Sequence, residues 1–233
     1  MWHTTISHII LYMKFNTPTH QRICEFIERY NPQYIIIDCD GTLYPNIFEA
    51  RSVFYESLYN FFSKKFNYSR KNTDIFLREQ KEKYGTVSEI AACLLSGIDE
   101  VEFNTEVIKS MDLEDLDIGT SSPWCILLEY NIPIIIFTNN SSFFASLIAR
   151  KVGIIHNVEH IFGESELHFV RKPSKEVFKV VTNFLPKDSR ILFFDDDELC
   201  VKMGNNFGWK SVQVVYSKKH LTDVKGEQVL IIN

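Results

Sequence analysis

The run Tyr34-Ile35-Ile36-Ile37-Asp38-Cys39-Asp40-Gly41-Thr42-Leu43-Tyr44 indicates the class of fold, because a short apolar segment ends here in two acidic residues. Four apolar residues in a row are typical of a strand buried on both faces of a parallel sheet. Asp38 and Asp40 stand two residues apart, so both side chains can point to one side of the following turn. Carboxylates this close repel each other unless a cation or a proton neutralises one. The pair suits a carboxylate nucleophile on Mg²⁺ beside an acid/base, and an Asp-rich turn is the alternative.

Three further apolar runs have the form of strands covered on both faces. They are residues 132–137, 190–194 and 211–215. Thr138 follows the first run and Asp195 follows the second. Helices are predicted where crossovers belong, with Ser141 or Ser142 as the cap of one and Ser174 as the cap of another. This alternation predicts a doubly wound, Rossmann-like α/β fold with a parallel sheet, whose ligands bind at the carboxyl ends of the strands.

Residues 38–131, between the first two predicted strands, form a segment far longer than a crossover needs. Apolar residues recur in it at three- and four-residue steps, and capping-box patterns begin at Thr86 and Asp99. A helix is also predicted near 18–30, and 112–123 reads as a return linker. We therefore expect an N-terminal helical segment at 1–29, an α/β core at 30–46 and 118–233, and an inserted helical cap at 47–117.

The composition of the 233 residues excludes several classes of protein. With 45% hydrophobic and 24% charged residues, the chain can build a core, so general disorder is excluded. A net charge of −5 argues against broad capture of nucleic acid, but not against a small phosphorylated substrate. Five scattered cysteines without a C-x-x-C pair indicate neither a disulfide framework nor a zinc knuckle, and they favour a reducing compartment.

No targeting or membrane segment is expected from the sequence. The most apolar N-terminal stretch, 6–13, is interrupted by His8 and lacks a preceding basic region and a small-residue cleavage site. No other run approaches the roughly 18 apolar residues that span a bilayer. We therefore expect a cytoplasmic protein that binds neither membrane nor nucleic acid, and its oligomeric state stays open.

Three other runs complete a pattern with Asp38 and Asp40. They are Ile136-Phe137-Thr138-Asn139-Asn140, Arg171-Lys172-Pro173-Ser174 and Phe193-Phe194-Asp195-Asp196-Asp197. Each has a simpler alternative: Thr138 as a strand-end hydroxyl, Lys172 as a solvated charge, and the aspartates as helix-capping acids. In this order, however, the four runs resemble the motifs of the haloacid dehalogenase (HAD) superfamily over about residues 34–216.

The resemblance implies a Mg²⁺-dependent phosphatase and a role for each matching residue. Asp38 would attack phosphorus and form an aspartyl-phosphate, while Asp40 would act as general acid and then as general base. Mg²⁺ would bind the carboxylates of Asp38 and Asp196 and the backbone carbonyl of Asp40. Asp195 would act through a water molecule. The residues expected to bind the substrate are Asp38, Gly41, Thr42, Thr138, Asn139 and Lys172, of which Thr138 and Lys172 would also be catalytic.

One position departs from the family pattern. Cys200 stands four residues after Asp196, where relatives usually carry Asp or Asn, and it is a weaker partner for Lys172 or for the metal site. Either Asp197 or Glu198 substitutes for the missing group, or activity is reduced. Because the other motif residues are present, an active enzyme is favoured.

The resemblance extends to one branch of the superfamily. The presence of Asp40 favours a phosphatase over a haloacid dehalogenase, whose first step proceeds without an acid at that position. The runs Leu43-Tyr44-Pro45, Tyr84-Gly85-Thr86-Val87 and Gly97-Ile98-Asp99 resemble the pyrimidine 5′-nucleotidase-like branch, which implies a nucleoside monophosphate or another small phosphate ester as substrate. The alternatives are a phosphoprotein or sugar-phosphate phosphatase, a phosphomutase, and a non-catalytic HAD-like binding scaffold.

Overall fold

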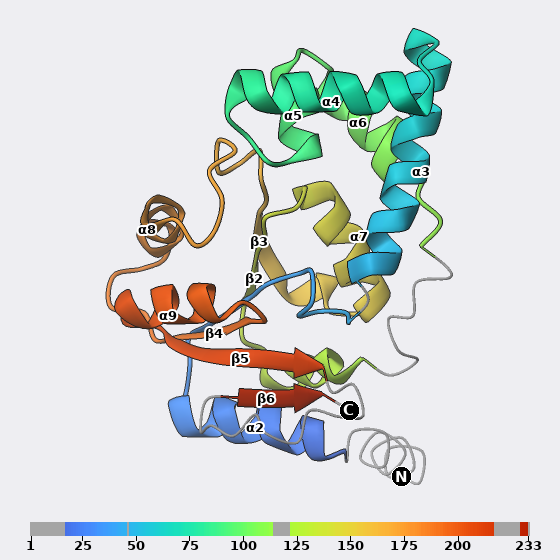
Figure 1. The fold of residues 1–233 in the computed structure, drawn as a ribbon. Coiled ribbons are helices and arrows are strands. Elements are labelled where there is room, and N and C mark those ends of the chain that lie inside the picture. The colour runs from blue at the N-terminus through green and yellow to red at the C-terminus, as the bar shows by residue number, and fades with distance from the viewer. Residues whose placement is uncertain (1–16, 46, 114–121, 217–228, 233) are drawn as a thin grey trace, which may run out of the picture.

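A sheet of six parallel strands forms the centre of the computed structural model, which describes residues 17–45, 47–113, 122–216 and 229–232 (Figure 1). The strands are β1 Tyr34–Ile37, β2 Ile134–Phe137, β3 Val158–Phe162, β4 Ile191–Asp195, β5 Lys210–Tyr216 and β6 Val229–Ile232. Their order is β3-β2-β1-β4-β5-β6. Residues 1–16 of the predicted N-terminal segment and 114–121 of the predicted linker lie outside the described residues.

The sequence predicts β1, β2, β4 and β5 to within two residues, but it does not predict β3 or β6. Both of these are edge strands, since β3 pairs with β2 and β6 pairs with β5. In β3, Glu159 is exposed and His160 is half-buried, so the strand lacks a continuous apolar run. β6 is four residues long and alternates between covered and exposed positions.

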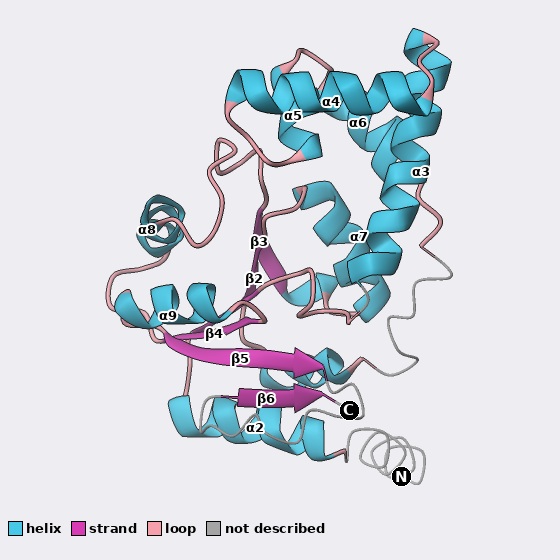
Figure 2. Ribbon diagram, in the orientation of Figure 1, coloured by secondary structure: helices cyan, strands magenta, loops and turns pink. Residues whose placement is uncertain are grey.

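Helices cover both faces of the sheet, which confirms the predicted doubly wound α/β fold (Figure 2). The helices of the core are α2 Pro18–Tyr30, the 3₁₀ helix η2 Pro123–Tyr130, α7 Ser142–Val152, α8 Lys175–Phe184 and α9 Glu198–Asn206. Ile35 and Ile37 of β1 share a core with α2, η2 and α7, whereas Ile36 shares one with α8 and α9. Successive residues of a strand point to opposite faces, so β1 is buried on both sides.

N-terminal caps start the helices that follow the strands, including the two that the sequence predicts, α7 and α8. The Ser141 hydroxyl accepts from the backbone N–H of Phe144 at the start of α7, and Ser174 caps α8 in the same way. Asp197 accepts from the N–H of Leu199 and caps α9. These bonds satisfy backbone N–H groups that the first turn of a helix leaves unpaired.

The described segment 47–113 contains four α-helices and one π-helix between β1 and β2. They are α3 Ile47–Phe66, α4 Arg70–Tyr84, α5 Glu89–Leu95, α6 Glu100–Phe103 and the π-helix η1 Asn104–Ile108. We call residues 47–108 the helical insert, which lies at the top of Figure 1. Its aromatic residues pack mostly among themselves, as the contacts of the Phe62 ring with Phe61, Phe66 and Phe76 illustrate. Within the described ranges, no helix has the length and apolar character that crossing a membrane requires.

The predicted start of α5 is wrong by two residues. Ser88, rather than Thr86, is the N-cap of this helix, and its hydroxyl accepts from the N–H of Ala91. The Thr86 hydroxyl accepts from the N–H of Ser88 instead, so it stabilises the turn before the helix. At the start of α6, Asp99 is the cap, as predicted.

Phe194 tests how much the core on the α2 face contributes to stability. Its ring is fully buried, and its centroid lies 6.3 Å from that of Phe26 and 5.2 Å from that of Trp124. Phe194→Ala should lower the free energy of unfolding by about 3–5 kcal/mol, because it removes buried apolar surface and leaves a cavity. Phe48→Ala is the matched control at a residue 82% exposed, where we expect a change within about 0.5 kcal/mol. Chemical denaturation measures both, and equal losses would contradict this account.

Candidate active site

A cavity of about 540 Å³ lies between the carboxyl ends of the central strands and the helical insert. Asp38 and Thr138 reach it from positions directly after β1 and β2, and Lys172 reaches it from the segment before α8. Parallel strands end at the same edge of a sheet, so side chains far apart in the chain meet here. The predicted site residues that line the cavity are Asp38, Asp40, Thr138, Asn139, Lys172, Asp195 and Asp196.

The Lys172 ammonium lies between two buried carboxylates. Its Nζ is 2.6 Å from Oδ1 of Asp38 and 2.7 Å from Oδ2 of Asp195, and all three side chains are less than a tenth exposed. Burial by itself disfavours the charged amine, but Asp195 and Asp38 outweigh that effect and raise the pKa of Lys172. The lysine is therefore a cation at ordinary pH, and it ties the end of β1 to the end of β4.

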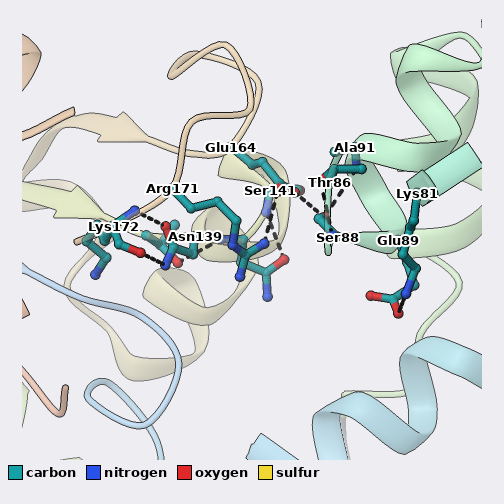
Figure 3. Close-up of polar contacts among 12 residues, drawn as sticks. Lys81, Thr86, Ser88, Glu89, Ala91, Asn139, Ser141, Glu164, Arg171 and Lys172 are labelled. Carbon is teal, nitrogen blue, oxygen red and sulfur yellow. Dashed lines mark hydrogen bonds and ion pairs between the residues drawn. The ribbon is translucent and has the colours of Figure 1, made fainter. Parts of the chain in front are cut away.

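The side chain of Asn139 holds the backbone of Lys172 in place (Figure 3). Asn139 Oδ1 accepts from the backbone N–H of Lys172 at 2.7 Å, and Asn139 Nδ2 donates to the carbonyl of the same residue at 3.2 Å. These two bonds span 33 residues of sequence and connect the loop after β2 to the lysine. The sequence predicts Asn139 as a substrate-binding residue, and the structure also gives its side chain a positioning role.

Three acidic side chains form a cluster that can hold a divalent cation. One carboxylate oxygen from each of Asp38, Asp195 and Asp196 lies within 4.8 Å of the other two. Burial, together with Asp195 and Asp40, raises the pKa of Asp38 well above its usual range despite Lys172. Burial and Asp195 raise the pKa of Asp196 to about 6. A single lysine does not balance this cluster, and a set of carboxylate oxygens fits the ligand preference of Mg²⁺.

Both carboxylate oxygens of Asp40 accept hydrogen bonds from neighbours that the sequence does not predict as site residues. The Tyr44 hydroxyl donates to Oδ1, and Asn140 Nδ2 donates to Oδ2 at 2.9 Å. Burial and the charge of Asp40 raise the pKa of Tyr44, so the phenol stays a donor. Asn140 stands within the quoted run after β2, yet nothing in its spacing indicates a contact with a residue 100 positions away.

Gly41 and Thr42 are not among the described residues that line the cavity, and they lie beside it. Both are buried, and the Thr42 hydroxyl donates to Oδ2 of Asp38 at 3.3 Å. Thr138 is fully buried, and its hydroxyl oxygen accepts from the backbone N–H of Asn140 at 3.1 Å. Gly41 has a φ of 80°, a left-handed conformation that glycine adopts without strain and that lets the chain turn directly after Asp40.

The aspartates at the end of β4 differ in their partners. Oδ1 of Asp195 accepts from the N–H of Asp197 at 2.9 Å, and its other oxygen pairs with Lys172. The Cys200 thiol lines the cavity, and burial followed by the charge of Asp195 raises its pKa. This side chain is therefore neutral at ordinary pH and contributes no charge to the site.

A second group of polar residues, also not predicted from the sequence, connects the helical insert to the core. Oε1 of Glu164 accepts from Nη1 of Arg171 at 3.0 Å, and Oε2 accepts from the Ser88 hydroxyl at 2.6 Å. Arg171 and Ser88 line the cavity. Arg171 directly precedes Lys172 in a quoted run, which is a weak indication of its place, whereas Ser88 and Glu164 carry no such signal.

The part of the cavity wall that the helical insert forms contains both aromatic and polar side chains. Phe54, Tyr55 and Ile90 are among its lining residues. The Tyr55 hydroxyl donates to Oε1 of Glu89 at 2.6 Å, and Lys81 pairs with the same oxygen, as Figure 3 shows for Lys81 and Glu89. This wall thus combines aromatic surface with polar groups that already have partners.

Several solved structures are similar to this chain. A hydrolase from Streptococcus pneumoniae TIGR4 has 17% sequence identity and a TM-score of 0.44, over 77% of this chain and 91% of that one. A HAD-superfamily hydrolase from Ehrlichia chaffeensis has 18% identity and a TM-score of 0.44, over 86% and 91%. The L-2-haloacid dehalogenase of Xanthobacter autotrophicus with chloropropionic acid covalently bound has 12% identity and a TM-score of 0.45, over 81% and 79%. No curated protein sequence matches significantly.

A family model provides the assignment. The haloacid dehalogenase-like hydrolase model matches residues 32–208, which is well over half of the 233-residue chain. The matched range includes the positions of Asp38, Thr138, Lys172 and Asp195. The chain therefore belongs to the family of haloacid dehalogenase-like hydrolases.

Proposed function

We propose that this hydrolase is a Mg²⁺-dependent phosphatase that cleaves phosphate monoesters through an aspartyl-phosphate on Asp38. The observation that carries the proposal is the buried Lys172 ammonium, 2.6 Å from Asp38 and 2.7 Å from Asp195, at a cavity that Asp40 and Thr138 also line. A nucleophile, an acid/base and fixed cationic and hydroxyl groups are the parts that phosphoryl transfer needs.

The two carboxylates after β1 divide the chemistry between them. Asp38 attacks phosphorus, and the bond from phosphorus to the leaving oxygen breaks as Asp40 gives that oxygen a proton. Asp40, then a carboxylate, takes a proton from the water that attacks the phosphoaspartate, and Asp38 is released with inorganic phosphate. The hydrogen bonds from Tyr44 and Asn140 hold the Asp40 side chain at the cavity, as the carboxylic acid in the first step and as the carboxylate in the second.

The other site residues bind the transferring phosphoryl group. The Thr138 hydroxyl, the Lys172 ammonium and backbone N–H groups of the Gly41–Thr42 and Asn139 turns are the donors that we assign to its oxygens. Asp38, Asp196 and the carbonyl of Asp40 would hold Mg²⁺, and Asp195 would act through a water molecule. When bound, Mg²⁺ supplies positive charge that offsets the phosphate and the clustered carboxylates.

A nucleoside monophosphate is the substrate that we propose, with residues 47–117 as the cap that covers it. The cavity volume of about 540 Å³ lies within the usual range for small-molecule sites, and Phe54 and Tyr55 offer rings against which a base can stack. The resemblance to the pyrimidine 5′-nucleotidase-like branch implies this substrate. The panel of substrates used for the reaction also tests it.

Asp38→Asn tests the nucleophile. With Mg²⁺ and a panel of nucleoside monophosphates, sugar phosphates and an aryl phosphate, this variant should lose at least about a thousandfold in kcat, because an amide does not form the phosphoaspartate. Acid-quenched wild-type protein should carry substrate phosphate that hydroxylamine releases, and the variant should carry none. Asp188→Asn, the same change at an exposed aspartate, should keep wild-type activity. Turnover of nothing in the panel, or full activity of Asp38→Asn, would contradict the proposal.

Asp196→Asn tests the metal site through stability rather than turnover. Saturating Mg²⁺ should raise the Tm of the wild type by about 5 °C, since the ion binds the folded cluster and relieves its repulsion. The variant should show less than half of this shift, because one ligand oxygen loses its charge. Differential scanning calorimetry with and without EDTA measures the effect. An equal shift in Asp196→Asn and Asp188→Asn would argue against this site.

Asn140→Ala tests the positioning of Asp40. Loss of the 2.9 Å bond from Nδ2 should lower kcat about ten- to a hundredfold with little change in KM, because the acid/base acts in the transition state and the phosphate ligands are untouched. Asn183→Ala, at an exposed position of α8, is the control. Steady-state kinetics on an aryl phosphate measures both variants. A change confined to KM would assign Asn140 to substrate binding instead.

A further inference from the structure

Glu164 is a buried carboxylate that the proposed chemistry does not use. Its side chain is 0% exposed, while that of its partner Arg171 is 35% exposed. Figure 3 shows Glu164 between Arg171, which belongs to the core, and Ser88, which belongs to the insert. Burial raises the pKa of Glu164, whereas the bond from Ser88 and the charge of Arg171 act in the opposite direction. The ionised form of Glu164 is therefore stabilised by both Ser88 and Arg171.

The backbone fixes Glu164 in this position. Its N–H donates to the carbonyl of Asn140 at 2.8 Å, which anchors it to the loop after β2. The preceding Gly163 packs so closely on the start of α7 that an added Cβ would lie 2.3 Å from the backbone nitrogen of Ser142. Glu164 is thus a rigid support, and it fixes the direction of the Arg171 guanidinium at the cavity.

Two of the three basic side chains in the described cavity lining pair directly with acids. Lys172 pairs with Asp38 and Asp195, and Arg171 pairs with Glu164. Arg51 lies against the ring of Tyr55, and its pKa is raised by its hydrogen bond to that residue, with a smaller contribution from Glu89. Among the described lining residues, acidic side chains outnumber basic ones by six to three. A bound Mg²⁺ would offset part of this excess and would still leave the lining without a net positive charge.

The ion pair with Glu164 largely neutralises the charge of Arg171, but it leaves N–H donors of the guanidinium for a ligand. A guanidinium has five N–H donors, and Glu164 accepts from Nη1, so donors remain for a ligand in the cavity. Neutral acceptors such as a carbonyl or hydroxyl oxygen satisfy these donors at no electrostatic cost. A second anionic group beside Arg171 would enter a net acidic cavity, where Glu164 already neutralises that guanidinium, which is unfavourable.

We propose that Arg171 selects substrates whose leaving group is polar but uncharged. Glu164 is the positioning residue that neutralises the Arg171 guanidinium and fixes its direction. The inference rests on the proposed phosphatase function and narrows its substrate class. Nucleosides and neutral sugars satisfy it, whereas alcohols that carry a carboxylate or a second phosphate do not.

The experiment compares two small esters that differ in one group. 2-Hydroxyethyl phosphate carries a hydroxymethyl group where 2-phosphoglycolate carries a carboxylate, so the ratio of their kcat/KM values isolates the leaving-group charge. The wild type should prefer the uncharged ester by about tenfold or more. Glu164→Gln, which frees the charge of Arg171, should reduce this ratio at least about tenfold, mainly by improving KM for phosphoglycolate. Glu166→Gln, the same change at an exposed glutamate two residues away, should leave the ratio unchanged.

Two other measurements separate the possible failures. Thermal melting establishes that Glu164→Gln is folded, and Arg171→Gln should remove the effect of Glu164→Gln in the double variant, since both act through one guanidinium. A wild-type preference for phosphoglycolate, or an equal loss on both esters in Glu164→Gln, would overturn the inference while leaving the phosphatase function intact. Absence of turnover on both esters, nucleoside monophosphates and aryl phosphate would refute the proposed function and this inference with it.

Discussion

The buried contact of Lys172 with Asp38 and Asp195 is the constraint on which the arrangement of the site depends. An ammonium group 3% exposed is stable only with carboxylates at hydrogen-bond distance, and removing one partner of such a buried pair costs about 3–5 kcal/mol. The contact requires β1 and β4 to be neighbours, which the sheet order provides. It also requires the segment before α8 to reach across the strand ends, where Asn139 fixes its backbone. Fold and site are therefore specified by the same interaction.

The sequence predicts the parts of the fold that are buried on both sides. β1, β2, β4 and β5 are covered strands, and their apolar runs are continuous enough to recognise. β3 includes the exposed Glu159, and β6 is a short edge strand, so neither carries that signal. The start of α5 is predicted at Thr86 rather than at Ser88 for a different reason. Both residues are good caps, and a local pattern does not show the contact of Ser88 with Glu164, 76 residues away.

The residues of the candidate site also divide into those that the sequence predicts and those that it does not. Asp38, Thr138 and Asp195 stand at strand ends, so the topology alone predicts that they meet. Tyr44, Asn140 and Arg171 are different, because their roles come from partners in other segments rather than from their place in a strand-end pattern. Asn140 meets Asp40 across 100 residues, and Arg171 meets a glutamate in the loop after β3. Long-range side-chain contacts of this kind have no periodicity or spacing in a single sequence.

Cys200 connects the departure from the family pattern to the electrostatics of the site. An acidic residue at this position would add a further carboxylate near Asp195 and compete for Lys172, whose charge is already divided between two acids. The thiol is neutral, because burial and Asp195 raise its pKa, so it avoids that competition. The ammonium therefore stays with Asp38 and Asp195, and Asp196 keeps no strong cationic partner among the described residues. Because of this imbalance, the three carboxylates at the edge of the sheet form a cluster that can hold a divalent cation.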